Sequence, residues 1–378
     1  ISAIASYQWS QSPLDGSYQV TGLQDIGNFV KRGGTWYTTA GGDGYGGFVD
    51  VSDKDIMYFV QGGTRRSTTG NFMAGYSTAS SSGVKYMAQS ISNPNNMVGA
   101  GEGGFHYSTD RGVSWMAANG AMKTGKSLCI SPVDENIVWG TAGGKLYKST
   151  NKGQSWSSVS GLSGNVNDVT CDSQNANVAW AVVSGTAIQK VYKTINGGNV
   201  WSNITSAVLD GQSVREITHD SKDKGGIYIG TQTGVYYYND DIADWVNWSA
   251  GLPWTQIQEM SVHKVEQKLR LASWGRGIWE SELYTEGGAS SSQAVSSSLI
   301  ASSQGLSSSF VNSSSSVLSS SVVSSSAILS SSVTLSSSVI ADICDGVPAW
   351  EAQSYNWKPT KEFVTYSGKL YSHSDWVS

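Results

Sequence analysis

The chain has 378 residues, a formal net charge of −5, 44 Gly and 15 Trp, and only 14% of its residues are charged. A composition rich in Gly and Trp and poor in charge is typical of a turn-dense all-β protein and argues against a helical bundle. The largest basic cluster is Arg65-Arg66, and no apolar run approaches the roughly 20 residues that cross a bilayer, so nucleic-acid and membrane partners are excluded.

Short apolar strand patterns recur at a spacing of about 40 residues along the first three-quarters of the chain. A period of 40 to 45 residues with four short strands per unit is typical of the blades of a β-propeller. The seventh unit shows only three clear strands, so we expect either that a strand from before Ile1 completes it or that the ring is larger. The predicted units are 1–38, 43–80, 84–118, 126–159, 166–204, 213–248 and 257–283.

Three units share the turn Ser/Thr-x-Asp/Asn-x-Gly-x-x-Trp, with its acid or amide spaced by 41 and then 45 residues. We expect the Asp or Asn to accept backbone N–H groups of its own hairpin and the Trp to pack between blades. The turn resembles the Asp-box (BNR) repeat of sialidase-like propellers, which implies a structural role. The residues concerned are Asp110, Asn151, Asn196, Trp115, Trp156 and Trp201.

A Ser-rich segment follows the last unit, with 27 Ser among residues 290–340 and no charge or Pro. Such a segment cannot bury enough apolar area to offset its chain entropy, and it predicts a flexible, disordered linker at 286–341. The propeller is accordingly assigned to 1–285. Linkers of this kind resemble those that join modules in secreted enzymes of polysaccharide-degrading bacteria.

The last part of the chain, 342–378, contains Cys344-Asp-Gly-Val-Pro-Ala-Trp350 and the hairpin pattern Tyr366-Ser-Gly-Lys-Leu-Tyr371. It resembles a carbohydrate-binding module of family 5/12, a small β domain, in truncated form. The resemblance implies that Tyr355 and Trp376 stack on the sugar rings of chitin or cellulose, because flat aromatic side chains cover sugar C–H faces well. A small β domain without sugar affinity is the alternative.

Loops on the propeller face opposite the Asp boxes, here called the open face, carry candidate chemistry. Asp25 and Asp43 flank one blade among glycines that would let a substrate approach the backbone, and glycoside hydrolysis needs two carboxyl groups across a cleft. We take both as candidate catalytic residues, although turns capped by their own Asp explain them as well. Trp254 and Trp274 are candidate sugar contacts, with packing between blades as the alternative. Other acidic residues expected on this face are Glu102, Asp168, Asp210 and Glu259.

Two resemblances bear on function. Gln24-Asp-Ile-Gly-Asn-Phe29 resembles the segment that carries a catalytic Asp in family 74 xyloglucanases, and Ala272-Ser-Trp-Gly-Arg-Gly-Ile-Trp279 resembles a bacterial BNR or sortilin-like group. The first implies a secreted glycoside hydrolase acting on a plant β-glucan, cellulose or chitin, with Asp25 as base. The second implies a propeller that binds a glycan or a protein without catalysis. Both remain open.

Other site classes find little support in the sequence. The four His are scattered and no Cys or His pair has metal-ligand spacing, so we expect neither a metal nor another cofactor. A sialidase would need three Arg on the open face, where only Arg215 and Arg276 are expected. Cys129 and Cys171 are predicted to be buried thiols. We expect a secreted monomer whose signal peptide lies outside this chain.

Overall fold

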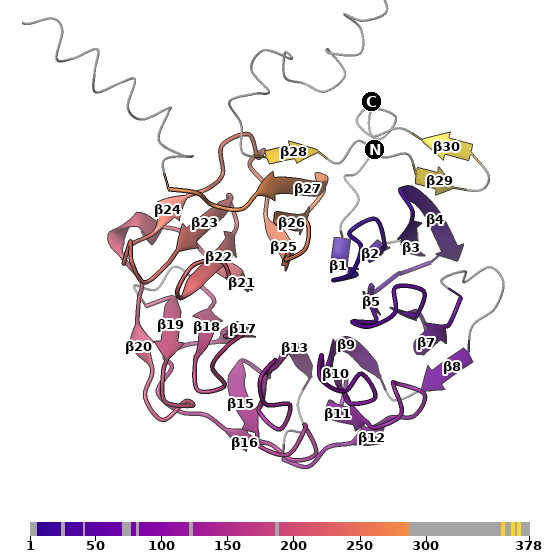
Figure 1. Cartoon of the computed structure of the whole chain (residues 1–378), viewed down its shortest axis with the longest axis horizontal. Helices are drawn as coiled ribbons and strands as arrows, with labels where there is room; N and C mark the ends of the chain where they lie inside the picture. Colours follow the sequence, from indigo (N-terminus) through magenta and orange to yellow (C-terminus); the bar gives the residue numbers. More distant parts are fainter. Residues whose placement is uncertain are drawn as a thin grey trace, which may run out of the picture. The chain divides into compact units, whose positions relative to one another are not determined.

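Seven sheets follow one another along the chain in this computed structural model and lie as blades around a common axis (Figure 1). The predicted seven-bladed all-β propeller is confirmed. The described residues contain one short 3-10 helix, η1 (Ala207–Leu209), and no helix among them is long and apolar enough to cross a membrane. The structure describes residues 6–23, 27–40, 42–69, 77–80, 83–120, 124–185, 189–286, 357–359, 364–366 and 369–371.

The strands of each blade lie in chain order from the axis to the rim, so the first strand of every blade is innermost (Figure 1). Blade 1 contains β1 (Ser6–Gln11), β2 (Gln19–Leu23), β3 (Gly27–Arg32) and β4 (Thr35–Ala40). Blade 2 contains β5 (Gly47–Val49), β6 (Met57–Val60), β7 (Thr64–Ser67) and β8 (Ser77–Ser80). Blade 3 contains β9 (Val84–Gln89), β10 (Met97–Gly101), β11 (Gly104–Ser108) and β12 (Met116–Ala117).

The remaining four blades repeat this arrangement. Blade 4 contains β13 (Gly125–Ile130), β14 (Val138–Ala142), β15 (Lys145–Ser149) and β16 (Ser157–Ser158). Blade 5 contains β17 (Val166–Cys171), β18 (Ala179–Val183), β19 (Val191–Thr194) and β20 (Ser202–Asn203). Blade 6 contains β21 (Val214–Asp220), β22 (Gly226–Thr231), β23 (Val235–Tyr238) and β24 (Val246–Asn247). Blade 7 contains β25 (Ile257–His263), β26 (Lys268–Ser273), β27 (Gly277–Glu282) and β28 (Trp357–Pro359).

The fourth strand of blade 7 is supplied by the tail. Strand β28 pairs antiparallel with β27, and neither a strand from before Ile1 nor a larger ring is needed. Trp357 is only 2% exposed, and its indole N–H donates to the carbonyl of Trp248 in blade 6. The buried indole of Trp357 thus links β28 to the neighbouring blade 6.

Blades 1 and 7 meet and close the ring. The side-chain amide of Gln11 donates to the carbonyl of Ser261 at 3.2 Å, and Arg270 donates back to the side-chain oxygen of Gln11 at 2.9 Å. The backbone N–H of Gly16 donates to the carboxylate of Glu266 at 2.9 Å. Residues about 250 positions apart therefore hold the two ends of the blade series together.

The core lies between blades, because each sheet buries both faces against its neighbours. In one cluster, Trp180 and Val182 of blade 5 pack with Ile217 and Ile229 of blade 6. The inner strands β17 and β21 mix buried and half-buried residues, whereas the second strands β18 and β22 are buried throughout.

The Asp-box turns join the third and fourth strands of blades 3, 4 and 5. In each box the Asp or Asn oxygen accepts the N–H of the residue four positions on, at 2.9 to 3.0 Å. Trp156 stacks on Phe105 of the preceding blade with ring centroids 4.0 Å apart, and Trp201 packs edge-to-face on Trp139 of the preceding blade. These contacts cap the turns and fix the spacing between blades.

The tail contributes two further strands, β29 (Val364–Tyr366) and β30 (Lys369–Tyr371), which form the hairpin expected around Tyr366 and Tyr371. Strand β29 also pairs parallel with β4 of blade 1. The predicted carbohydrate-binding residues Tyr355 and Trp376 lie outside the described residues, as does the predicted linker except for Glu286. The module at 342–378 therefore stays a prediction.

Candidate functional site

The inner strands carry a β-bulge near their first residue in blades 1, 3, 4, 5, 6 and 7. Two residues of the inner strand then oppose one residue of the second strand, which re-aims the side chains at that point. Each bulge lies at the open-face end of its strand, because the chain enters the inner strand from the loop between blades. The bulges of blades 4 to 7 hold Lys126, Asp168, Glu216 and Glu259, which we call the axial cluster.

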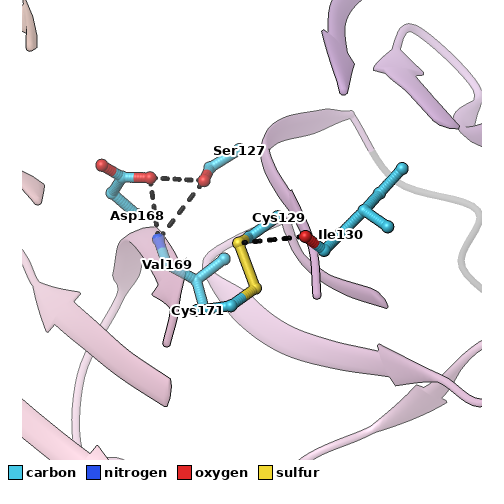
Figure 2. The surroundings of a disulfide bond; sticks show 6 residues. All are labelled: Ser127, Cys129, Ile130, Asp168, Val169 and Cys171. Carbon is cyan, nitrogen blue, oxygen red and sulfur yellow. Dashed lines mark hydrogen bonds between the residues drawn. A yellow bond between two sulfur atoms is a disulfide. The ribbon is translucent and has the colours of Figure 1, made fainter. Parts of the chain in front are cut away.

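Asp168 is the hydrogen-bonding centre of this cluster. Its carboxylate accepts hydrogen bonds from the hydroxyl of Ser127 in blade 4 and from the N–H of its neighbour Val169 at 2.7 Å (Figure 2). It also accepts the N–H of Ile217 in blade 6 at 2.8 Å. Because these donors come from three successive inner strands, Asp168 joins blades 4, 5 and 6. Its oxygens are occupied, so it is a structural acceptor and not a free base.

Glu216 and Glu259 flank Asp168 from blades 6 and 7. Burial, followed by the charge of Asp168, raises the pKa of Glu216 well above its usual value, and Glu216 shares a hydrogen bond with Asp168. The same two causes raise the pKa of Glu259 to about 8. Glu259 therefore holds its proton near neutral pH and can donate a hydrogen bond. Glu216 is buried, whereas Glu259 is partly accessible.

Lys126 supplies the positive charge of the cluster. Its ammonium lies 3.5 Å from a carboxyl oxygen of Glu216, and the charge of Glu216 raises the pKa of the lysine. Between the bulges of blades 6 and 7, the guanidinium of Arg215 donates to the side-chain oxygen of Gln258 at 3.5 Å. The open-face end of the axis is thus rich in hydrogen-bond donors although three acids lie there. No group of three His, Cys, Asp or Glu side chains in the described ranges is placed to hold a metal ion.

A disulfide reinforces the junction of blades 4 and 5. Cys129 of β13 and Cys171 of β17 are bonded, with their Cα atoms 6.0 Å apart (Figure 2). The prediction of two buried thiols is therefore wrong. Neither strand by itself indicates the pairing, which depends on how adjacent blades are aligned. Their separation of 42 residues is close to one blade period, which places them on adjacent inner strands.

The two candidate catalytic residues have different outcomes. Asp25 lies outside the described residues, whereas Asp43 is exposed on the open face in the loop that precedes β5. Two of the glycines near them are tightly packed. A Cβ on Gly44 would lie 2.2 Å from the backbone of Gly27, and one on Gly22 would lie 1.9 Å from the backbone nitrogen of Gly46. The two loops therefore touch backbone to backbone.

The two candidate sugar-binding tryptophans lie at the open-face end of blade 7. Trp254 is 84% exposed and Trp274 is 45% exposed. Their loops are joined, since the N–H of Trp274 donates to Gln256 at 2.8 Å and the hydroxyl of Thr255 donates to the carbonyl of Trp274 at 2.9 Å. The structure thus brings the two loops together at the blade that also holds Glu259.

Asp168 and Glu259 were predicted on the open face, whereas Glu216 was not. A signal was available, because an apolar–polar–acid–apolar pattern repeats at the start of three consecutive inner strands. It reads Val166-Asn-Asp-Val169, Val214-Arg-Glu-Ile217 and Ile257-Gln-Glu-Met260. Alignment of the inner strands at this pattern would have predicted the acids of the axial cluster.

Comparisons with known proteins agree with the fold. No known family and no curated protein matches the sequence. Among solved structures, YCF48 bound to a D1 peptide is 12% identical and superposes with a TM-score of 0.57, over 75% of this chain and 93% of that one. YCF48 from Cyanidioschyzon merolae is also 12% identical, with a TM-score of 0.55, over 73% and 94%.

An ancestral GH74 enzyme is 18% identical, with a TM-score of 0.49, over 61% of this chain. The match covers 34% of that enzyme, so the chain corresponds to about a third of its length. At these identities the likeness to YCF48 shows a shared propeller fold and nothing about activity.

Proposed function

We propose that the chain is a secreted protein that binds a polysaccharide on its open face, with Trp254 and Trp274 as the stacking surface. The exposed tryptophan pair is the observation that carries this proposal. The indole of Trp254 is largely exposed and that of Trp274 is about half exposed, their loops are joined, and indoles bury the C–H faces of sugar rings well. A plant β-glucan, cellulose or chitin is the partner class.

Polar groups suited to sugar hydroxyls lie at the same end of blade 7. Glu259 and Gln258 occupy the bulge of β25, directly after the loop that carries Trp254. A protonated carboxyl group and an amide can each donate and accept hydrogen bonds, as recognition of a hydroxyl requires. Secretion is supported by the Cys129–Cys171 disulfide, because such bonds persist in oxidising compartments.

The test is affinity electrophoresis of the full chain in xyloglucan, β-glucan and soluble derivatives of cellulose and chitin. All variants are made in a Trp376→Ala background, so that the predicted tail module cannot mask an effect of the propeller. Loss of one stacked ring costs about 1 to 2 kcal/mol, so Trp254→Ala and Trp274→Ala should each weaken binding about 5- to 30-fold.

Tyr37→Ala is the matched control, because Tyr37 is 47% exposed but lies on the outer strand β4. It should leave binding unchanged. If both tryptophan variants bind the polysaccharide as tightly as the Tyr37→Ala control does, the proposed stacking surface is refuted.

A second candidate is hydrolysis of the bound polysaccharide, favoured by Glu259. A carboxyl group that stays protonated near neutral pH is suited to protonate a glycosidic oxygen, and Asp43 is an exposed carboxyl group on the same face. Release of reducing sugar should then fall at least a hundredfold in Glu259→Gln and in Asp43→Asn. Asp241→Asn, an exposed acid on the Asp-box face, should retain the wild-type rate. If wild-type protein binds the polysaccharide but releases no reducing sugar, hydrolysis is refuted and the binding function is retained.

A further inference from the structure

A cavity of about 430 Å³ lies between blades 4 and 5 on the open face. It is built where the two inner strands begin, next to the turn that joins β14 to β15. The lining residues are Thr124, Lys126, Thr141, Ala142, Gly143, Gly144, Asn165, Val166, Asn167 and Ser184. This volume is within the range of small-molecule sites.

The lining has a distinct chemistry. Lys126 is the one charged residue among the ten, and the others with polar side chains are hydroxyl or amide residues. No carboxylate and no aromatic ring belongs to this set, so the cavity differs from the tryptophan surface of blade 7. Such a lining suits a small polar molecule with a negative charge and several hydroxyl groups.

Lys126 is available to a ligand. Its side chain is 40% exposed, and its ammonium lies 3.5 Å from a carboxyl oxygen of Glu216, which is longer than a good charged hydrogen bond. Glu216 in turn shares its hydrogen bond with Asp168. The charges of Glu216 and Asp168 raise the pKa of Lys126, so its ammonium stays charged, and its side chain is part of the cavity lining.

Two glycines form part of the cavity wall. Gly143 and Gly144 have φ values of +56° and +74°, which side-chain-bearing residues rarely adopt. A Cβ on Gly144 would lie 2.7 Å from the side-chain oxygen of Asn165. Glycine at this turn therefore leaves the exposed amide of Asn165 in place beside the cavity.

We propose that this cavity binds a uronic acid residue, with Lys126 pairing with its carboxylate and Asn165, Thr124 and Ser184 meeting its hydroxyl groups. The polymeric form of this ligand rests on the proposed polysaccharide binding. A single lysine with neutral amide and hydroxyl neighbours fits one carboxylate, whereas a phosphate would be expected to draw several cations. The carboxylate can belong to a polymer or to a free uronate.

The experiment measures binding of the full chain to polygalacturonate and glucuronoxylan, and to the same polymers after reduction of the carboxyl groups to alcohols. Wild-type protein should bind the carboxylated forms at least tenfold more tightly. Lys126→Gln should remove this preference, and Lys126→Arg should retain it. Lys145→Gln is the matched control, since Lys145 is an exposed lysine directly after Gly144 but outside the lining.

Free glucuronate and galacturonate, titrated by calorimetry, separate the two sources of the carboxylate. If wild-type protein binds a free uronate and Lys126→Gln does not, the cavity proposal is supported. If no polymer binds in the same experiments, only the polysaccharide proposal is refuted. Equal affinity of wild-type protein for carboxylated and reduced polymers overturns the cavity proposal and leaves the tryptophan surface standing. Lys126→Gln with wild-type affinity, or no binding of any uronate, also overturns it.

Discussion

Replacement of Glu259 by Gln should flatten the pH dependence of the propeller's stability. In the folded state the pKa of Glu259 is raised from 4.5 to about 8 by burial and by Asp168. Between these two pH values the folded protein holds a proton that the unfolded chain has lost, so the free energy of unfolding falls as pH rises. Gln cannot ionise, so this contribution should be absent from the variant.

The magnitude follows from the size of the pKa change. A rise from 4.5 to about 8 corresponds to at most ~5 kcal/mol between pH 4.5 and pH 8. Glu259 keeps partial access to solvent, which relaxes the charged form, so we expect about half of this, ~2 kcal/mol. Glu216 contributes in the same direction and remains in the variant.

Denaturant unfolding of wild-type protein and Glu259→Gln at pH 5 and pH 8 measures the difference. The free energy of unfolding of wild-type protein should fall by ~2 kcal/mol more than that of the variant over this interval. Glu282→Gln is the charge control, because that carboxyl group is 72% exposed at the rim. If Glu259→Gln and Glu282→Gln show the same pH dependence as wild-type protein, Glu259 is not protonated in the folded state and the argument fails.

Three further predictions concern other contacts within the propeller, and denaturant unfolding checks each. Cys129→Ser should cost up to ~4 kcal/mol, since the bond to Cys171 closes a loop of 42 residues, and reductant should then have no further effect. Asp168→Asn should cost about 2 to 4 kcal/mol, because an amide cannot accept all the hydrogen bonds made to this carboxylate. Gly44→Ala should cost about 2 kcal/mol, because its Cβ would overlap the backbone of Gly27; an unchanged midpoint would refute the loop contact.

Much of the fold was predictable from the sequence because the propeller repeats a local pattern. The Asp-box turns mark the third and fourth strands of three blades, and apolar strand patterns extend that spacing to the others. The origin of the last strand of blade 7 was not predictable. Trp357 lies more than 70 residues beyond β27 in the chain, and no local pattern reports a pairing over that distance.

The candidate site was predicted less well, for a physical reason. The properties of Glu216 and Glu259 depend on Asp168 in a neighbouring blade and on burial at the axis, which a single strand does not reveal. The role expected for glycines near Asp43 also depended on an unseen neighbour, the backbone of the adjoining loop. Trp254 is exposed, in agreement with its predicted place in an open-face loop. That prediction required only the order of strands within the blade.

The repeated bulge gives this propeller a set of interchangeable positions. Gln8, Tyr86, Asp168, Glu216 and Glu259 occupy equivalent places on five inner strands, each paired with the second strand of its own blade. Because backbone hydrogen bonds hold each blade, the side chain at such a place can change without altering the sheet. Gene duplication within such a ring would supply several copies of one position, and substitution at each copy can then produce a new combination of charge and shape around the axis.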